Sequence, residues 1–192
     1  MSLKQLTLKL LMLIARLSAQ RIQTLQKLSL EEMRISAGKY TFYISALLKQ
    51  TSANGGQKRH LFPVQFRSFD LYKRLCVVEF LEAYIKRTVP LWKGTKQLLI
   101  CYKAPHGPAS KETISQWIKQ TMKAAGIDTT VFKPHSKRSA ATSAAKAANV
   151  PIQEIMNTAG WRSGSTFAKF YDCPIRSENN FAEAVLSSTS LK

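Results

Sequence analysis

A single β-rich segment interrupts a chain whose hydrophobic pattern is otherwise helical. Residues 33–66, MRISAGKYTFYISALLKQTSANGGQKRHLFPVQF, are dense in β-branched and aromatic residues, and SANGG within them is a turn signal. The pattern predicts strands near 33–36, 41–48 and 58–65 that form a small antiparallel sheet. Pro63 favours an edge position late in the last strand, because proline cannot donate a ladder hydrogen bond.

Amphipathic helices are predicted on both sides of this sheet. The first runs through about residue 29, and the second covers 71–88 and is ended by Pro90. Between the second helix and the next, QLLICY is either a short strand or a buried apolar run. The apolar residues that form the inner faces of the two helices are Leu3, Leu6, Leu10, Leu13 and Leu17 in the first and Leu71, Leu75, Val78, Leu81 and Ile85 in the second.

Capping and breaking residues delimit the remaining helices. Ser110 is a candidate N-cap for a helix that Gly126 closes. An alanine-rich helix follows PHSKR and runs to Asn149, and Pro151 can start the next one. A last helix is predicted from SGST to Tyr171.

The charge of the chain points to nucleic acid as its partner. The sequence has 29 Lys and Arg residues against 11 Asp and Glu residues, a formal net charge of +18. Such an excess on a folded domain is typical of nucleic-acid binding. A basic protein kept soluble by its charge, or one that binds acidic membranes, is the alternative. Nucleic acid is favoured because the basic residues recur along the whole chain rather than in one tail.

The cysteine and histidine content favours neither a metal site nor disulfides. Three cysteines (Cys76, Cys101 and Cys173) lie far apart, and the chain has only three histidines. This pattern supports no zinc site and no disulfide framework, and it indicates a reducing compartment. Lys9 and Arg16 interrupt the apolar N-terminal run, so it is predicted to be a helix rather than a signal peptide, and no segment approaches a membrane span.

His135 and Arg138 open the alanine-rich helix in the stretch PHSKRS. Residues three apart share one helix face, so the two side chains are expected to project together where the helix begins. A helix start also attracts anions through its free N–H groups and its dipole. The pair is therefore a candidate anion site.

Cleavage of a phosphodiester without a metal requires a particular set of side chains. Attack loads negative charge onto the non-bridging oxygens, which arginines can stabilise because the guanidinium fork matches phosphate. The leaving oxygen needs a proton donor, and a side chain must act as the nucleophile. Tyrosine can serve, but its pKa near ~10 leaves only about a thousandth ionised at pH 7, so nearby cations or a base must offset that cost.

Four stretches resemble the active-site segments of the tyrosine recombinases, the integrases that cut DNA with a tyrosine. These are LSAQRIQTL, YISALLKQTSANGG, HSKR and GWRSGSTFAKFYD. The residues that match the family's catalytic positions, in the family's order, are Arg21, Lys49, His135, Arg138, Trp161 and Tyr171. The segment IMNTAGWRSGSTFAKFYDCPI is similar in sequence to recombinases carried by DIRS- and Ngaro-like retroelements of animals.

The resemblance implies a mostly helical α+β fold with a small antiparallel sheet at one edge. It implies that residues 1–175 form a catalytic domain, that 176–192 form a tail with a short helix, and that the usual N-terminal DNA-clamping domain is absent, as in a fragment or a truncated element. Two positions depart from the family pattern. Thr24 stands where an acidic residue is frequent three places after the first arginine, and Trp161 stands where many members carry histidine.

The resemblance also implies DNA breakage and joining. Tyr171 attacks the scissile phosphate, giving a 3′-phosphotyrosyl link and a free 5′-hydroxyl. Arg21 and Arg138 hold the non-bridging oxygens, and Lys49 protonates the leaving oxygen. His135 assists proton movement and contacts phosphate, while the Trp161 indole donates one hydrogen bond. Neither ATP nor a metal cofactor is implied.

The implied partners are double-stranded DNA and further copies of the chain. Family members act as tetramers on two duplexes, and the tail around residues 181–186 is a candidate for packing on a neighbouring subunit. A retroelement enzyme would work in the nucleus of its host, and another family member in the cytoplasm; secretion is not expected.

Several alternatives stay open at this point. Lys58 lies across the same predicted hairpin as Lys49 and is the other candidate for the catalytic lysine. Taken singly, Tyr171 or Trp161 could be a packed aromatic residue, and Arg138 a solvated charge. At the level of function, the alternatives are a non-catalytic DNA-binding protein derived from a recombinase, a type IB topoisomerase, and a ribonuclease that uses His135 and Lys49.

Overall fold

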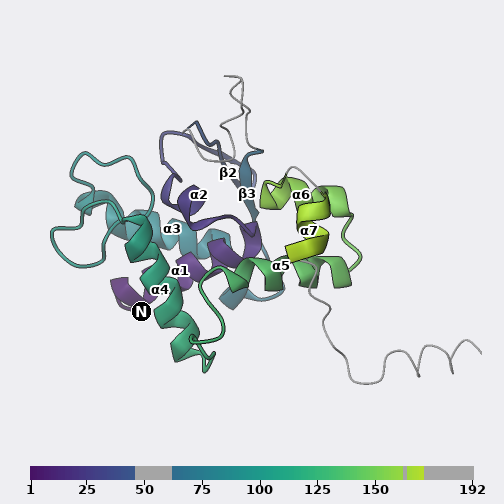
Figure 1. The fold of residues 1–192 in the computed structure, drawn as a ribbon. Helices are drawn as coiled ribbons and strands as arrows, with labels where there is room; N and C mark the ends of the chain where they lie inside the picture. The colour runs from purple at the N-terminus through teal and green to yellow at the C-terminus, as the bar shows by residue number, and fades with distance from the viewer. Residues whose placement is uncertain (46–61, 162–163, 171–192) are drawn as a thin grey trace, which may run out of the picture.

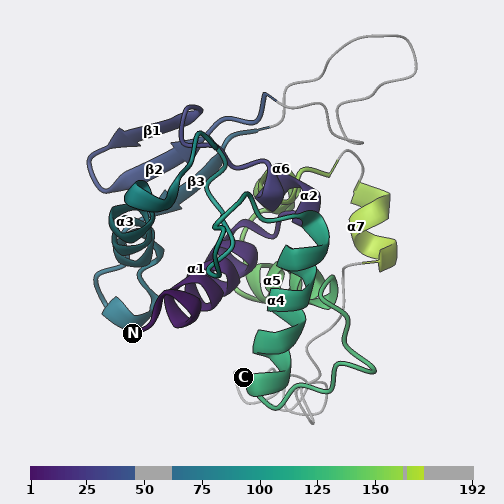
Figure 2. The same cartoon turned by 90° about the vertical axis from the view of Figure 1, so that its left-hand side faces the viewer.

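The structure is a computed structural model that describes residues 1–45, 62–161 and 164–170. Most of its elements are helices, and one small sheet lies at an edge of the fold (Figure 1). The sheet and α3 lie on one side of the central helix α1, and α5, α6 and α7 gather on the other side (Figures 1 and 2).

Helix α1 (Leu3–Ser18) is the centre of the fold. A capping box starts it, because the Ser2 hydroxyl accepts from the Gln5 N–H while the Gln5 side chain accepts from the Ser2 N–H. Its apolar stripe packs against α3, α4, α5 and β3. The helix residues that are fully buried include Leu10, Leu11 and Ile14.

The sheet has three antiparallel strands in the order β1-β2-β3. They are β1 (Met33–Ser36), β2 (Lys39–Phe42) and β3 (Val64–Arg67). Phe42 lies opposite Val64 in the ladder and packs edge-on against Phe66, with 6.1 Å between ring centroids. One face of the sheet is thereby joined to the main hydrophobic core.

Two further helices complete this main core. Helix α3 (Val77–Thr88) follows a short 3-10 turn, η1 (Lys73–Leu75), and is continued by a second, η2 (Val89–Leu91), that contains Pro90. Helix α4 (Lys111–Ala124) follows the buried run QLLICY, which is paired only through isolated bridges. The Ser110 hydroxyl accepts from the Thr113 N–H, as an N-cap should.

A second, smaller core joins the C-terminal helices to the end of α1. Helices α5 (Ser136–Ala147), α6 (Ile152–Ala159) and α7 (Gly164–Phe170) follow one another in the chain. The buried residues of this second core are Ala19, Ile155, Ala159, Trp161 and Phe167. It brings the turn after α1 next to the end of α6.

The prediction of one continuous helix through residue 29 is wrong. The chain breaks at Ala19, whose φ of 47° is left-handed, and a short helix, α2 (Ile22–Gln26), begins after Arg21. The Ser18 hydroxyl donates to the Ile14 carbonyl and accepts from the Gln20 N–H, which stabilises the break. Leu17, predicted on the inner face, is 51% exposed as a result.

The bounds of the strands and of α3 also differ from the prediction. Strand β2 ends at Phe42 rather than at 48, and β3 begins only after Pro63, whose missing N–H cannot join a ladder. The strand order places β3 at an edge of the described sheet, as predicted, but Pro63 directly precedes this strand instead of lying late in it. Leu71 and Leu75 are exposed rather than internal, because the α-helix starts six residues after Leu71, at Val77.

Candidate active site

Arg138 is the largest fully buried side chain of the described residues. It lies in the first turn of α5, and its Nη2 donates to the Ala159 carbonyl at 2.6 Å. The guanidinium also lies over the Trp161 ring, 4.5 Å from its centroid. The alternative that Arg138 is a solvated charge is therefore excluded. Because the side chain has no exposed surface here, a ligand can reach it only after a local movement.

Trp161 is held by the end of α6 and by α7. Gly160 takes a left-handed φ of 67° at the C-cap of α6, and the Trp161 N–H then donates to the Met156 carbonyl at 2.9 Å. The indole packs against Phe167, with ring centroids 5.4 Å apart. Trp161 is thus a packed aromatic residue, as one of the sequence alternatives stated, and its ring also contacts Arg138.

Arg21 and His135 both stand at helix starts beside this pair. Arg21 is the N-cap of α2 and His135 is the N-cap of α5, and neither side chain makes a capping hydrogen bond. Partial burial lowers the pKa of His135, and the positive charges of Arg138, Lys137 and Arg21 lower it further. The α1–α2 turn and the start of α5 therefore bring these four basic residues within electrostatic range of one another.

Lys137 is a residue of the site that the sequence analysis missed. Its Nζ donates to the carbonyl oxygens of Ala15, at 3.3 Å, and Gln20, at 3.4 Å. Burial lowers the pKa of Lys137 to about 8, and the charge of Arg138 contributes to that shift. Its position between His135 and Arg138 was the only signal in the sequence, and a single lysine there does not reveal an inward direction.

Thr24 supplies no charge where the resemblance leads us to expect an acidic residue. It lies in α2 and is 1% exposed. Its hydroxyl oxygen makes no hydrogen bond to any residue in the described part of the chain. Whatever orients Arg21 is therefore not a carboxylate at this position.

The remaining predicted site residues lie outside the described residues. Lys49 and its alternative Lys58 fall within 46–61, and Tyr171 falls within 171–192. Helix α7 ends at Phe170, so the last described residue of that helix directly precedes Tyr171. Their roles stay predictions.

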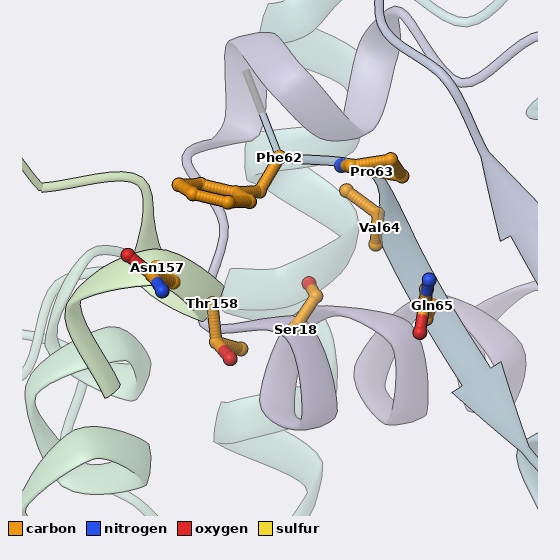
Figure 3. A pocket seen from close by; sticks show the side chains of 7 residues that line it. All are labelled: Ser18, Phe62, Pro63, Val64, Gln65, Asn157 and Thr158. Atoms are coloured by element: carbon orange, nitrogen blue, oxygen red, sulfur yellow. The ribbon is translucent and has the colours of Figure 1, made fainter. Parts of the chain in front are cut away.

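A small cleft lies against the last turn of α6. It has a volume of about 230 Å³ and is bounded by the end of α1, the start of β3 and α6 (Figure 3). The Phe62 ring extends across it toward Asn157, and Ser18 and Thr158 line its other side. No charged side chain lines the cleft, so it is separate from the four basic residues described above.

Neither a metal site nor a membrane span is found in the described ranges. Within residues 1–45, 62–161 and 164–170, no three His, Cys, Asp or Glu side chains gather as metal ligands. In the same part of the chain, no helix is both long and apolar enough to cross a bilayer.

Comparison with solved structures places the fold in a known class. XerH site-specific recombinase, bound to palindromic difH substrate in a post-cleavage complex, matches with a TM-score of 0.67 at 15% identity, covering 99% of this chain and 47% of that chain. XerA recombinase matches with a TM-score of 0.60 at 14% identity, covering 97% and 61%. A lambda integrase dimer bound to a COC′ core site matches with a TM-score of 0.56 at 17% identity, covering 92% and 47%.

The fold is therefore that of a tyrosine-recombinase catalytic domain, as predicted. The chain belongs to the phage integrase family, whose sequence profile matches residues 2–173. It spans about half the length of the XerH and lambda integrase chains that it matches. No curated protein sequence matches significantly.

Proposed function

We propose that this protein breaks and rejoins DNA in site-specific recombination, through a 3′-phosphotyrosyl intermediate on Tyr171. The observation that carries the proposal is the convergence of Arg21, His135 and Arg138 from the α1–α2 turn and the start of α5, with Trp161 stacked on Arg138. Fixed positive charge of this kind stabilises a phosphorane-like transition state.

Each of the described site residues has its own role in the proposed cleavage. Arg21 and Arg138 bind the non-bridging oxygens of the scissile phosphate, because an arginine stays protonated and offers two parallel donors. Burial and the neighbouring positive charges lower the pKa of His135, which favours the neutral imidazole and lets a ring nitrogen accept a proton. Trp161 fixes the plane of Arg138 and offers its indole N–H to phosphate.

The residues outside the described ranges complete the reaction in this proposal. The Tyr171 hydroxyl gives up its proton to a base, a role that neutral His135 can fill, and its oxygen attacks phosphorus. The 5′-oxygen leaves with a proton from Lys49, and Lys58 is the alternative donor. One phosphodiester is exchanged for another, so the energy of the bond is retained. Rejoining is the same step in reverse, with a 5′-hydroxyl as the nucleophile.

The partners and setting are also proposals. Lambda integrase is recorded as a dimer on a core site and as a tetramer on a Holliday junction. We infer that this chain likewise acts on duplex DNA as a homo-oligomer, with residues 176–192 packing on a neighbour. The sequence of residues 155–175 supports a DIRS- or Ngaro-like retroelement origin, and with it a nuclear location.

A pool of nicked duplexes with randomised sequence around the nick tests the proposal. The nick lets the short 5′-hydroxyl fragment diffuse away, so the covalent intermediate accumulates. We expect a protein–DNA adduct that survives boiling in detergent and forms equally well with EDTA. The DNA recovered from the adduct identifies the preferred sites.

One observation favours a second candidate function. The uncharged, buried Thr24 beside Arg21 fits a non-catalytic DNA-binding protein derived from a recombinase. That candidate binds the same pool without forming any adduct. Relaxation of supercoiled DNA without joining of two duplexes would instead indicate a type IB topoisomerase.

A further inference from the structure

Lys137 bonds the main chain on both sides of the turn that leads to Arg21. Its Nζ reaches the Ala15 carbonyl, in the last turn of α1, and the Gln20 carbonyl, directly before Arg21. A protonated amine has three donors, so one side chain can hold both acceptors at once. Lys137 itself is in the first turn of α5 and is followed by Arg138. It therefore links the main chain of one predicted phosphate-binding arginine to the helix that carries the other.

The same turn is attached to α6 from another direction. Gln20 is 5% exposed, and its Nε2 donates to the Thr158 carbonyl at 2.5 Å. The next carbonyl along, that of Ala159, accepts from Arg138. Ala19 packs in the second core with Trp161. The two residues before Arg21 are thus held on the segments that hold Arg138, with Lys137 as the charged contact between them.

If Lys137 affected only folding, a charged side chain would be energetically unfavourable at this position. Its ammonium is removed from water, beside the positive charge of Arg138 and at a helix start, where the dipole disfavours a cation. Two hydrogen bonds to carbonyls offset part of this cost. A charge kept at such a place is better explained by what it holds than by the stability that it adds.

We propose that Lys137 is a positioning residue for DNA cleavage, which holds Arg21 at the scissile phosphate by binding the carbonyls of Ala15 and Gln20. The role rests on the proposed function. It also supplies what Thr24 does not, since no carboxylate three residues after Arg21 is present to orient that arginine. Lys137 touches neither phosphate nor leaving group in this scheme and acts through Arg21.

The competing role for Lys137 is that of proton donor to the leaving oxygen. A lowered pKa would suit that role. The geometry disfavours it, because the described hydrogen bonds of Nζ, at 3.3 and 3.4 Å, are to main-chain carbonyls of α1 and of the turn. The two roles differ in one measurable respect. A 5′-bridging sulfur departs without a proton, since a thiol has a pKa near ~8.5, so it rescues a missing proton donor but not a displaced arginine.

The test compares Lys137→Met, Lys137→Arg and the control Lys4→Met on DNA recovered from wild-type adducts, with oxygen and with sulfur as the leaving atom. Lys4 is exposed near the start of α1, about 16 Å along the helix from Ala15, so its variant removes the same charge away from the site. Single-turnover adduct formation, duplex affinity and the thermal midpoint are measured for each. Lys137→Gln replaces the methionine variant if that variant unfolds.

We expect Lys137→Met to form adduct roughly 10–100-fold more slowly, as a small misplacement of a catalytic group does. Its affinity and thermal midpoint should stay near those of Lys4→Met, and sulfur should not restore its rate. Lys137→Arg should recover part of the rate, because a guanidinium can still donate to both carbonyls. In the Arg21→Ala background, Lys137→Met should cause no further loss, since Lys137 acts through Arg21.

Three results would overturn the positioning role while leaving the proposed function intact. The first is an undiminished rate of adduct formation in Lys137→Met. The second is restoration of that rate by sulfur as the leaving atom. The third is that Lys137→Met and Arg21→Ala lower the rate additively when combined. Absence of any adduct with the wild-type protein overturns the proposed function itself, and the positioning role falls with it.

Discussion

Arg138 combines complete burial with a permanent charge, which is costly unless its donors are used. One donor is satisfied by the Ala159 carbonyl, and the face of the guanidinium rests on Trp161. Both contacts fix the plane of the group, which prepares it for bidentate binding of phosphate. A lysine at this position could supply the charge but neither the plane nor the fork.

We therefore expect Arg138→Ala to slow adduct formation by at least 10²–10³-fold, the usual loss for one preorganised charge donor. Arg138→Lys should recover little of that rate. Single-turnover cleavage measures both, with Arg34→Ala as control because Arg34 is an exposed residue of β1. Efficient cleavage by Arg138→Lys would show that only the charge matters.

Arg21 should behave like Arg138 if the alignment of LSAQRIQTL is right. Arg21→Ala is expected to lose at least 10²-fold in rate, since it removes the second donor to the same oxygens. Circular dichroism should confirm an intact fold, because the Arg21 side chain makes no capping bond in α2. Near-normal cleavage would mean that another arginine fills this place.

The pKa of His135 reports the burial of its imidazole and the positive charges near it. Its pKa should lie below 6.5, and it should rise toward 6.5 in Arg138→Gln, because a neighbouring positive charge is lost. Imidazole proton shifts in NMR measure this, with His135→Gln used to assign the signal among three histidines. As pH falls below about 6.5, the unfolded chain binds this proton first, so the free energy of unfolding should decrease. An unchanged pKa in Arg138→Gln would contradict the proximity of the two side chains.

At the scale of elements, the end of α6 sets the position of Trp161. Gly160, at φ 67°, makes this end, and Gly126, at φ 77°, follows α4 in the same conformation. Each glycine-to-alanine change should lower the free energy of unfolding by about 1 kcal/mol, because alanine disfavours positive φ. Only Gly160→Ala should also slow cleavage, since it alone shifts Trp161 against Arg138. Equal cleavage rates in both variants would argue against a catalytic role for this helix end.

Elements marked by a local signal were predicted well from sequence. Ser110 caps α4 and Pro151 directly precedes α6, as their chemistry requires. No glycine or proline in the sequence signals the break after α1, because Ala19 itself takes the left-handed φ. The exposure of Leu71 was missed because the helical spacing of apolar residues begins at Leu71, before the α-helix starts at Val77.

For the site, the order of the matching segments predicted the residues but not their contacts. His135 was predicted at the start of its helix and is its N-cap. The contact of Arg138 with Trp161 depends on how α6 packs on α5, and the bonds of Lys137 depend on a turn more than a hundred residues away in the chain. Local patterns cannot encode such contacts.

At the scale of the whole molecule, the net charge of +18 should dominate DNA binding. Each phosphate that a basic residue neutralises releases counterions, and with about 6–10 contacts the affinity should fall roughly 10³–10⁵-fold from about 50 to 200 mM salt. Titrations of one random duplex and of the recovered sites measure this slope. A shallow slope would mean that the basic residues face another partner, and a strong preference for one site would mean that this domain reads sequence by itself.

The proposed function requires Tyr171 to be the nucleophile. Tyr171→Phe removes one hydroxyl, so affinity for duplex should stay unchanged while the adduct disappears. Tyr43, exposed just after β2, provides the matched control, and Tyr43→Phe should form adduct at the wild-type rate.

The most direct measurement is mass spectrometry of peptides from the wild-type adduct after nuclease digestion. We expect the nucleotide on the phenolic oxygen of Tyr171, attached through a 3′-phosphate, with a free 5′-hydroxyl on the released strand. A nucleotide on any other residue, or a 5′-phosphate on the enzyme, would contradict the account.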